Sequence, residues 1–187
     1  MKKATLFLVV IFLSSGLFAQ ENKLKNTGDK PSSKEKKEAR VEIRKKQFIE
    51  KAELVESRKF VLEADYLVSA DGSRHMASSD LDFIIVDSSR AVIQSGENVG
   101  IGLNNVGGIT AKGNITSWKV ERNEKKLSLT VRMNVNTSLG LYTVFMYSPS
   151  NGKTTATVSA NFITNRADFV GKLVQPEDSI TFEGWSF

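Results

Sequence analysis

The sequence contains no cysteine, only three prolines and a single histidine among its 187 residues. Without cysteine the chain has no disulfide, no thiolate metal ligand and no cysteine nucleophile. It also lacks the cysteine that carries the lipid of a bacterial lipoprotein. One histidine, His75, disfavours a zinc site. The stability of the fold must therefore come from apolar packing.

No catalytic constellation stands out around His75. It lies in a polar run, residues 73–80, whose serines and Asp80 are typical of a turn. A triad instead needs nucleophile, base and acid brought together by the fold. Gly100 and Gly102 begin like a dinucleotide fingerprint, but Asn105 replaces the third glycine and no helical pattern follows. We expect no catalytic residue, no metal site and no cofactor.

Acidic residues in the predicted strands alternate with apolar ones. Asp80 and Asp82 flank Leu81, and Glu63 and Asp65 flank an alanine. Alternation places such carboxylates on the face opposite the core. We expect them on a solvated outer surface rather than in a calcium or acid–base site.

The net charge of +5 is unevenly distributed. Residues 20–58 carry twelve Lys and Arg against eight Asp and Glu, whereas the remainder from Lys59 onward carries twelve against thirteen. Nucleic-acid binding by a barrel requires a basic groove with aromatic stacking platforms. The nearly neutral body predicts no nucleic-acid partner.

Residues 1–19 have the layout of a cleaved signal peptide. Lys2 and Lys3 precede an unbroken apolar run at 6–13, and small residues lead to Ala19. The apolar run is short for a membrane span. We expect cleavage near Ala19 and a periplasmic or secreted mature protein.

A flexible linker and a helix are predicted next. Residues 20–33 are polar and bury too little to fold. Within 34–57, the apolar residues Val41, Phe48, Ala52 and Val55 recur at helical spacing. This N-terminal helix either packs its apolar stripe on the following domain or rests a basic face on an anionic membrane or cell-wall polymer.

After Arg58 the apolar residues recur at every second position, which is the period of a β-strand. Residues 127–135 alternate apolar and polar, as do 118–121 and 156–162, and Asn151-Gly152 is a strong hairpin signal. No long helix is predicted after residue 57. We expect residues 58–174 to form an all-β domain of eight or nine short antiparallel strands, a small lipocalin-like barrel or a sandwich.

One predicted strand, residues 141–147, is apolar on both faces. Leu141, Phe145 and Tyr147 share one face, and Tyr142 and Val144 lie on the other. Either the N-terminal helix or a partner protein would cover the outer face. We expect the helix to do so, because its apolar stripe needs a surface to pack against.

Four segments carry a family resemblance, namely residues 52–65, 80–87, 115–122 and 169–174. They resemble the bacterial family catalogued as domain of unknown function 4251, over about residues 46–174. The resemblance implies an exported protein of Gram-negative bacteria with a lipocalin-like β-barrel topology. It implies no activity and no catalytic residues.

Two functions follow as expectations. The first is non-enzymatic binding of a small apolar ligand, such as a lipid, inside a barrel just wide enough to hold one. Its expected lining residues are Trp118, Met133, Phe145 and Phe162. The second is an envelope structural or interaction protein with a solid barrel, which contacts a partner protein or a membrane surface through residues 34–57.

The C-terminal tail, residues 175–187, ends in aromatic residues and should dock on the barrel. Asp178-Ser179-Ile180 matches a short acceptor pattern for O-glycosylation, so Ser179 is a candidate modification site.

Overall fold

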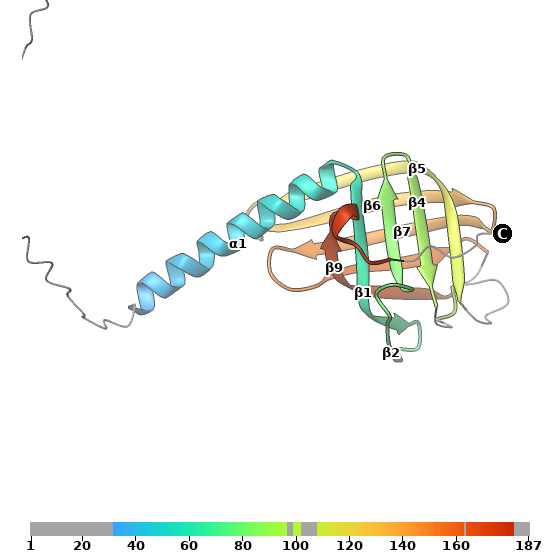
Figure 1. Cartoon of the computed structure of the whole chain (residues 1–187), viewed down its shortest axis with the longest axis horizontal. Coiled ribbons are helices and arrows are strands. Elements are labelled where there is room, and N and C mark those ends of the chain that lie inside the picture. Colours follow the sequence, from blue (N-terminus) through green and yellow to red (C-terminus); the bar gives the residue numbers. More distant parts are fainter. Residues whose placement is uncertain (1–31, 97–98, 102–107, 163, 182–187) are drawn as a thin grey trace, which may run out of the picture. The chain divides into compact units, whose positions relative to one another are not determined.

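The computed structural model describes residues 32–96, 99–101, 108–162 and 164–181. The predicted signal peptide, residues 20–31 of the linker and residues 182–187 of the tail lie outside the described residues. Of the described residues, 33–181 are helix, strands and their connections (Figure 1).

One helix precedes a series of strands. In chain order the elements are α1 (Ser33–Glu56), β1 (Lys59–Ser69), β2 (Arg74–Met76), β3 (Phe83–Asp87), β4 (Arg90–Ser95), β5 (Ile109–Asn123), β6 (Ser128–Thr137), β7 (Gly140–Pro149), β8 (Thr154–Ala160), β9 (Arg166–Val174) and the 3₁₀ turn η2 (Pro176–Asp178). The predicted helix and all-β domain are confirmed. Residues 118–121, expected as a short strand, are part of the longer β5, which begins at Ile109.

The sheet closes into an antiparallel barrel of eight strands. From β3 to β9, strands that are consecutive in the chain pair with each other. β1 pairs with both β3 and β9 and so closes the barrel. The short β2 is an extra strand, which pairs with the end of β1. Closure depends on Gly171 of β9, which lies opposite Ala64 of β1. A Cβ at Gly171 would collide with the backbone oxygen of Glu63.

The barrel interior is filled by a single apolar cluster. Alternate residues of β7 and β8 are buried, as the period of two predicts. The same cluster includes residues of β1, β3, β4, β5, β6 and β9, and three residues of α1. An eight-stranded barrel is just wide enough for side chains to fill its interior.

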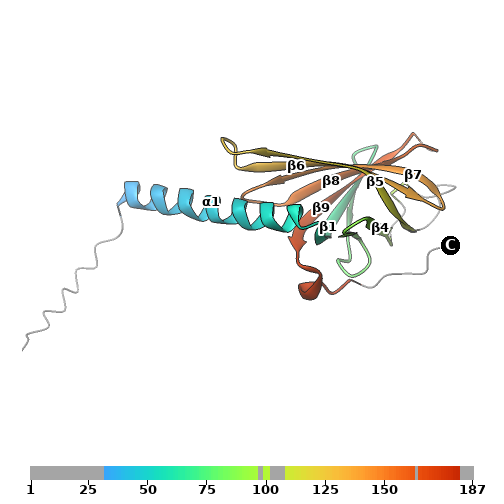
Figure 2. The same ribbon diagram turned by 90° about the horizontal axis from the view of Figure 1, so that it is seen from above.

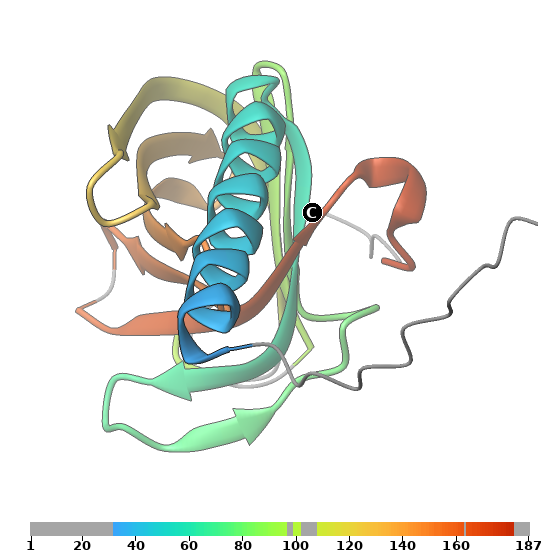
Figure 3. The same ribbon diagram turned by 90° about the vertical axis from the view of Figure 1, so that its left-hand side faces the viewer.

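The helix packs against one end of the barrel rather than against its outer wall. Phe48, Ala52 and Val55 of α1 are buried in the interior cluster. Figure 3 shows α1 in front of the ring of strands. The expectation that α1 covers the outer face of β7 is therefore wrong, and Phe145 and Tyr147 on that face stay 38% and 43% exposed.

Candidate functional site

The second half of α1 is fixed to the barrel by polar contacts around its buried residues. The ammonium of Lys51 donates to the backbone oxygens of Pro149, at 2.7 Å, and Gly152, at 3.2 Å. Pro149 is the last residue of β7, and Gly152 lies in the β7–β8 connection. Burial lowers the pKa of Lys51 below its ordinary value. These contacts hold the helix across the end of the barrel.

Arg122, near the end of β5, holds the last turn of α1 from the other side. Its Nη1 lies 3.1 Å from Oε1 of Glu56, and its guanidinium lies 5.5 Å from the ring centroid of Phe48. Figure 2 shows the β5–β6 hairpin extending alongside α1. β5 continues past its pairing with β4, and Arg122 in this extension is the residue that contacts Glu56 and Phe48 of α1.

The first half of α1 is packed much less, although Arg44 Nε donates a hydrogen bond to Ser150 Oγ of the barrel at 3.5 Å. Every residue from Ser33 to Gln47 is exposed, including Val41, which the apolar stripe predicted to be buried. This segment, which we call the free half of α1, carries seven basic and three acidic residues. Lys36, Arg40 and Arg44 recur every four residues and share one face, while the three glutamates lie on the other side of the helix.

The four residues predicted to line a ligand cavity have different surroundings. Met133 is buried, 4% exposed, in the interior cluster. Trp118 and Phe162 are partly buried against that cluster, and Trp118 packs on Phe60 and under the guanidinium of Arg58. Phe145 points outward, so the inward orientation predicted for it is wrong. Both faces of its strand are apolar, and the sequence alone did not show which face the barrel encloses.

The end of the barrel opposite α1 is also closed by side chains. Val99 and Ile101, in the connection between β4 and β5, are 3% and 1% exposed and join the interior cluster. The hydroxyl of Tyr142 donates to the backbone oxygen of Ile101 at 3.3 Å, and burial raises the pKa of Tyr142 to about 12. Phe162 packs edge-on against Tyr142. Apolar side chains therefore meet the interior cluster at both ends.

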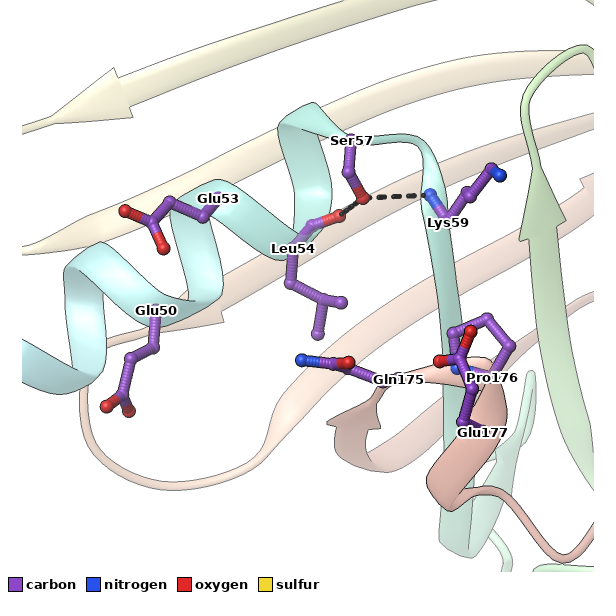
Figure 4. A pocket seen from close by; sticks show the side chains of 8 residues that line it. All are labelled: Glu50, Glu53, Leu54, Ser57, Lys59, Gln175, Pro176 and Glu177. Atoms are coloured by element: carbon purple, nitrogen blue, oxygen red, sulfur yellow. Dashed lines mark hydrogen bonds between the residues drawn. The ribbon is translucent and has the colours of Figure 1, made fainter.

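An open groove runs between α1 and the segment that follows β9 (Figure 4). One part of it, of about 380 Å³, is lined by Glu50, Glu53, Leu54, Ser57, Lys59, Gln175, Pro176 and Glu177. A neighbouring part of about 610 Å³ shares Glu50, Leu54 and Gln175 and continues toward Gly152. In Figure 4 the side chain of Leu54 points toward Gln175. The groove combines carboxylates with a small apolar floor.

Glu63 is a buried carboxylate that sequence reasoning missed. It is 1% exposed, where a solvated position was expected. Its Oε1 accepts from Ser179 Oγ at 2.9 Å and from the backbone N–H of Ile180 at 3.1 Å, and its Oε2 lies 3.1 Å from Nζ of Lys172. Burial raises the pKa of Glu63, but the bonds from Lys172, Ile180 and Ser179 outweigh it and lower the pKa overall.

Glu63 therefore fixes the tail on the outside of the barrel. The described part of the tail, residues 175–181, contains η2, which contacts β1 (Figure 1). This part docks on the barrel, whereas the aromatic end, residues 182–187, lies outside the described residues. The hydroxyl of Ser179, the candidate glycosylation site, is the group that donates to Glu63. A second apolar cluster, of Val61, Phe83 and Val92, lies on the same outer side of β1, β3 and β4.

Asp82 is the second carboxylate whose position was predicted wrongly. It is 1% exposed and precedes β3 in a turn. It accepts from the backbone N–H groups of Ser78 and Gly96, both at 2.9 Å, and from Ser95 Oγ at 3.1 Å. The alternation of Asp82 with apolar residues was read as a strand face, whereas the residue joins a turn to the end of β4.

The β1–β2 hairpin brings Ser69 to 3.0 Å from Nε2 of His75. Asp71 lies in the same turn, but its carboxylate accepts both the N–H and the hydroxyl of Ser73, which lower its pKa. A catalytic relay requires the acid to orient the ring of the base. Here the acid holds the turn instead.

Two further properties of the described residues also bear on function. Within 32–96, 99–101, 108–162 and 164–181, no group of three His, Cys, Asp or Glu is placed to hold a metal ion. No helix in this part of the chain is long and apolar enough to cross a membrane.

The fold and these sites define a small closed β-barrel of eight strands with an N-terminal helix packed on one end. Residues 42–173 match the family model described as Domain of unknown function (DUF4251). The chain belongs to this family. The match begins within α1, so most of the free half of α1 lies outside it.

A solved structure shares the fold. It is the crystal structure of a DUF4251 family protein from Bacteroides eggerthii DSM 20697, with 22% sequence identity and a TM-score of 0.62. The alignment covers 75% of this chain and 95% of that chain. No curated protein matches the sequence.

Proposed function

We propose that the protein is an exported, non-enzymatic interaction protein that binds an anionic membrane surface through the free half of α1. The observation that carries this proposal is the contrast within one helix. Residues 33–47 are exposed, and Arg44 among them reaches the barrel through a hydrogen bond from Nε to Ser150 Oγ at 3.5 Å, whereas Phe48, Ala52 and Val55 of the same helix are buried in the barrel. The barrel thus acts as a rigid base that holds a basic helical segment in solvent.

Charge supports an anionic surface as the partner. The seven basic residues of the free half exceed its three acidic ones, and Lys36, Arg40 and Arg44 form a basic face. Basic residues near an anionic lipid surface contribute about 1 kcal/mol each to binding. Of the exposed apolar residues of the helix, Val41 and Ile49 lie on one side and Ile43 on the other, so they form no continuous apolar face. We therefore infer adsorption on the headgroups rather than insertion of an apolar face.

The marginal stability expected of the free half of α1 also favours a partner. An isolated helix of about 15 residues is marginal in water, and most helices owe their stability to packing. A surface that neutralises the basic face would add to the support that the buried half provides.

The alternative of an apolar ligand inside the barrel has less support. The interior cluster is continuous, and side chains of α1 and of the β4–β5 connection meet it at the two ends. Native mass spectrometry of protein purified from its own envelope fraction tests this alternative. An added mass that is lost on denaturation would favour the ligand, and the bare mass of the chain favours the interaction function.

Vesicle binding tests the proposal directly. We expect the mature chain to sediment with phosphatidylglycerol vesicles and not with phosphatidylcholine vesicles, and to be released by salt. The triple variant Lys36→Gln, Arg40→Gln, Arg44→Gln should bind about 100-fold more weakly, since three contributions of about 1 kcal/mol are lost.

A matched control is available on the opposite face. Removing the charges of Glu35, Glu38 and Glu42 by Gln substitution alters the same number of residues, and this variant should bind at least as tightly as the parent. Equal binding of all three proteins, or no binding of the parent to the anionic vesicles, contradicts the proposal. Binding to an acidic protein in place of the vesicles would also overturn it.

A further inference from the structure

A second surface, on the outer wall of the barrel, has a composition unlike the rest of the molecule. Three consecutive outward positions of β6, β7 and β8 lie side by side in register. We call this grid the hydroxyl–aromatic face. Its rows are Thr130, Tyr147 and Thr155; Arg132, Phe145 and Thr157; and Asn134, Thr143 and Ser159.

The centre of the face is aromatic and its flanks are polar. Tyr147 and Phe145 are 43% and 38% exposed on the outer wall of the barrel. Two residues apart on one strand, their side chains project from the same face about 7 Å apart. The guanidinium of Arg132 lies 5.0 Å from the ring centroid of Phe145 and holds the ring in place.

The flanking groups are hydrogen-bonding side chains in fixed positions. Thr143 Oγ1 donates to Asn134 Oδ1 at 3.1 Å, and Thr157 Oγ1 donates to Asp168 Oδ1 at 2.6 Å. Each hydroxyl keeps acceptor capacity toward solvent when its proton is used in this way. Aromatic rings and hydroxyl groups are thus presented together on a rigid sheet.

The composition of the grid bears on three classes of partner, namely proteins, nucleic acids and strongly charged ligands. No aliphatic side chain occurs in the grid. Ser and Thr, which are under-represented among the residues that dominate protein–protein binding, fill five of its nine positions, against two residues of enriched types, Tyr147 and Arg132. Nucleic-acid binding depends on several Lys and Arg, and the grid has one. Its only charged group is Arg132, so it has little to attract a strongly charged ligand.

We propose that the hydroxyl–aromatic face binds a neutral polysaccharide. The C–H groups on one side of a sugar ring carry partial positive charge and are attracted to the electron-rich face of an aromatic ring. Tyr147 supplies such a platform along β7, and Phe145 supplies the ring face that the guanidinium of Arg132 leaves uncovered. The hydroxyl and amide side chains on β6 and β8, with Arg132, donate to and accept from the sugar hydroxyls.

Affinity electrophoresis in native gels tests the proposal, with four soluble neutral polysaccharides as probes: hydroxyethylcellulose, xylan, galactomannan and dextran. We expect at least one of them to retard the mature chain. The double variant Phe145→Ala, Tyr147→Ala should lose about tenfold or more in affinity, because both stacking contacts are removed. Both residues are outward-facing, so circular dichroism should show an intact fold.

Tyr66→Ala is the matched control. Tyr66 is a partly exposed tyrosine elsewhere on the barrel, under the guanidinium of Arg74 at 3.5 Å. This variant should be retarded like the parent. No retardation by any of the four probes, or equal retardation of the double variant, overturns the proposal. Retardation should persist at about 0.5 M salt, where ionic contacts of exposed charges are screened, and this separates it from binding through α1.

Discussion

Ser179 and Glu63 are 116 residues apart in sequence, yet the hydroxyl of Ser179 donates to the Glu63 carboxylate at 2.9 Å. The bond joins the tail to the first strand of the barrel. Since Glu63 is 1% exposed, its charge depends on this hydroxyl, the N–H of Ile180 and the ammonium of Lys172. The tail is therefore part of the environment that keeps a buried carboxylate ionised.

Glu63→Gln should destabilise the fold near neutral pH. The lowered pKa of Glu63 means that the folded state favours the ionised form, so this stabilisation is present above the ordinary glutamate range and is lost as pH falls through the folded pKa. Hydrogen bonds to a charged group contribute about 1.5 to 3 kcal/mol. Urea unfolding of parent and variant at a series of pH values measures the difference.

We expect the difference between parent and Glu63→Gln to shrink as the pH becomes acidic. Glu177→Gln, an exposed substitution in η2, is the control and should change stability by less than about 0.5 kcal/mol at any pH. A difference that is independent of pH would show that Glu63 acts by shape rather than by charge.

Truncation of α1 should change the stability of the fold little up to Phe48 and greatly beyond it. A chain that begins at Gln47 keeps Phe48, Ala52 and Val55 and should unfold within about 0.5 kcal/mol of the mature protein. A chain that begins at Lys59 removes all three from the core. Loss of a buried phenylalanine alone costs about 3 to 5 kcal/mol, so this chain should be unfolded or severely destabilised in thermal denaturation. Equal stability of the two truncated chains would mean that α1 is dispensable for the barrel.

Met133 and Phe145 test which residues face inward. Met133→Ala should cost about 2 to 5 kcal/mol, because it leaves a cavity in the interior cluster. Phe145→Ala, on the outer wall, should cost less than about 1 kcal/mol. Chemical denaturation of both variants gives the comparison. A larger loss for Phe145→Ala would reverse the assignment of the two faces.

Gly171→Ala should weaken barrel closure. A methyl group there meets the backbone of Glu63 and Ala64 on β1, and backbone cannot move aside as a flexible side chain can. Overpacking of this kind costs about 1 to 3 kcal/mol or more. Gly96→Ala is the comparison, because its added Cβ would meet Leu81 at an ordinary 3.4 Å. Thermal unfolding with similar losses for both variants would show that closure tolerates a side chain at Gly171.

The periodicity of the sequence determined the secondary structure, the all-β class and the position of the helix. These properties depend on local spacing, which is written along the chain as periods of 3.6 and 2. The residues that α1 buries near its end, Phe48, Ala52 and Val55, could be named for the same reason. Local spacing did not reveal where the helix leaves the barrel, so Val41 was expected to be buried.

Tertiary structure alone decided which face of each strand is enclosed and which carboxylates are buried. β7 is apolar on both faces, and only barrel closure assigns Tyr142 to the interior and Phe145 to the outer wall. Glu63 is buried because a segment more than a hundred residues later crosses its strand and supplies hydrogen-bond donors. Alternation specifies two faces, but what covers each face depends on contacts between distant segments.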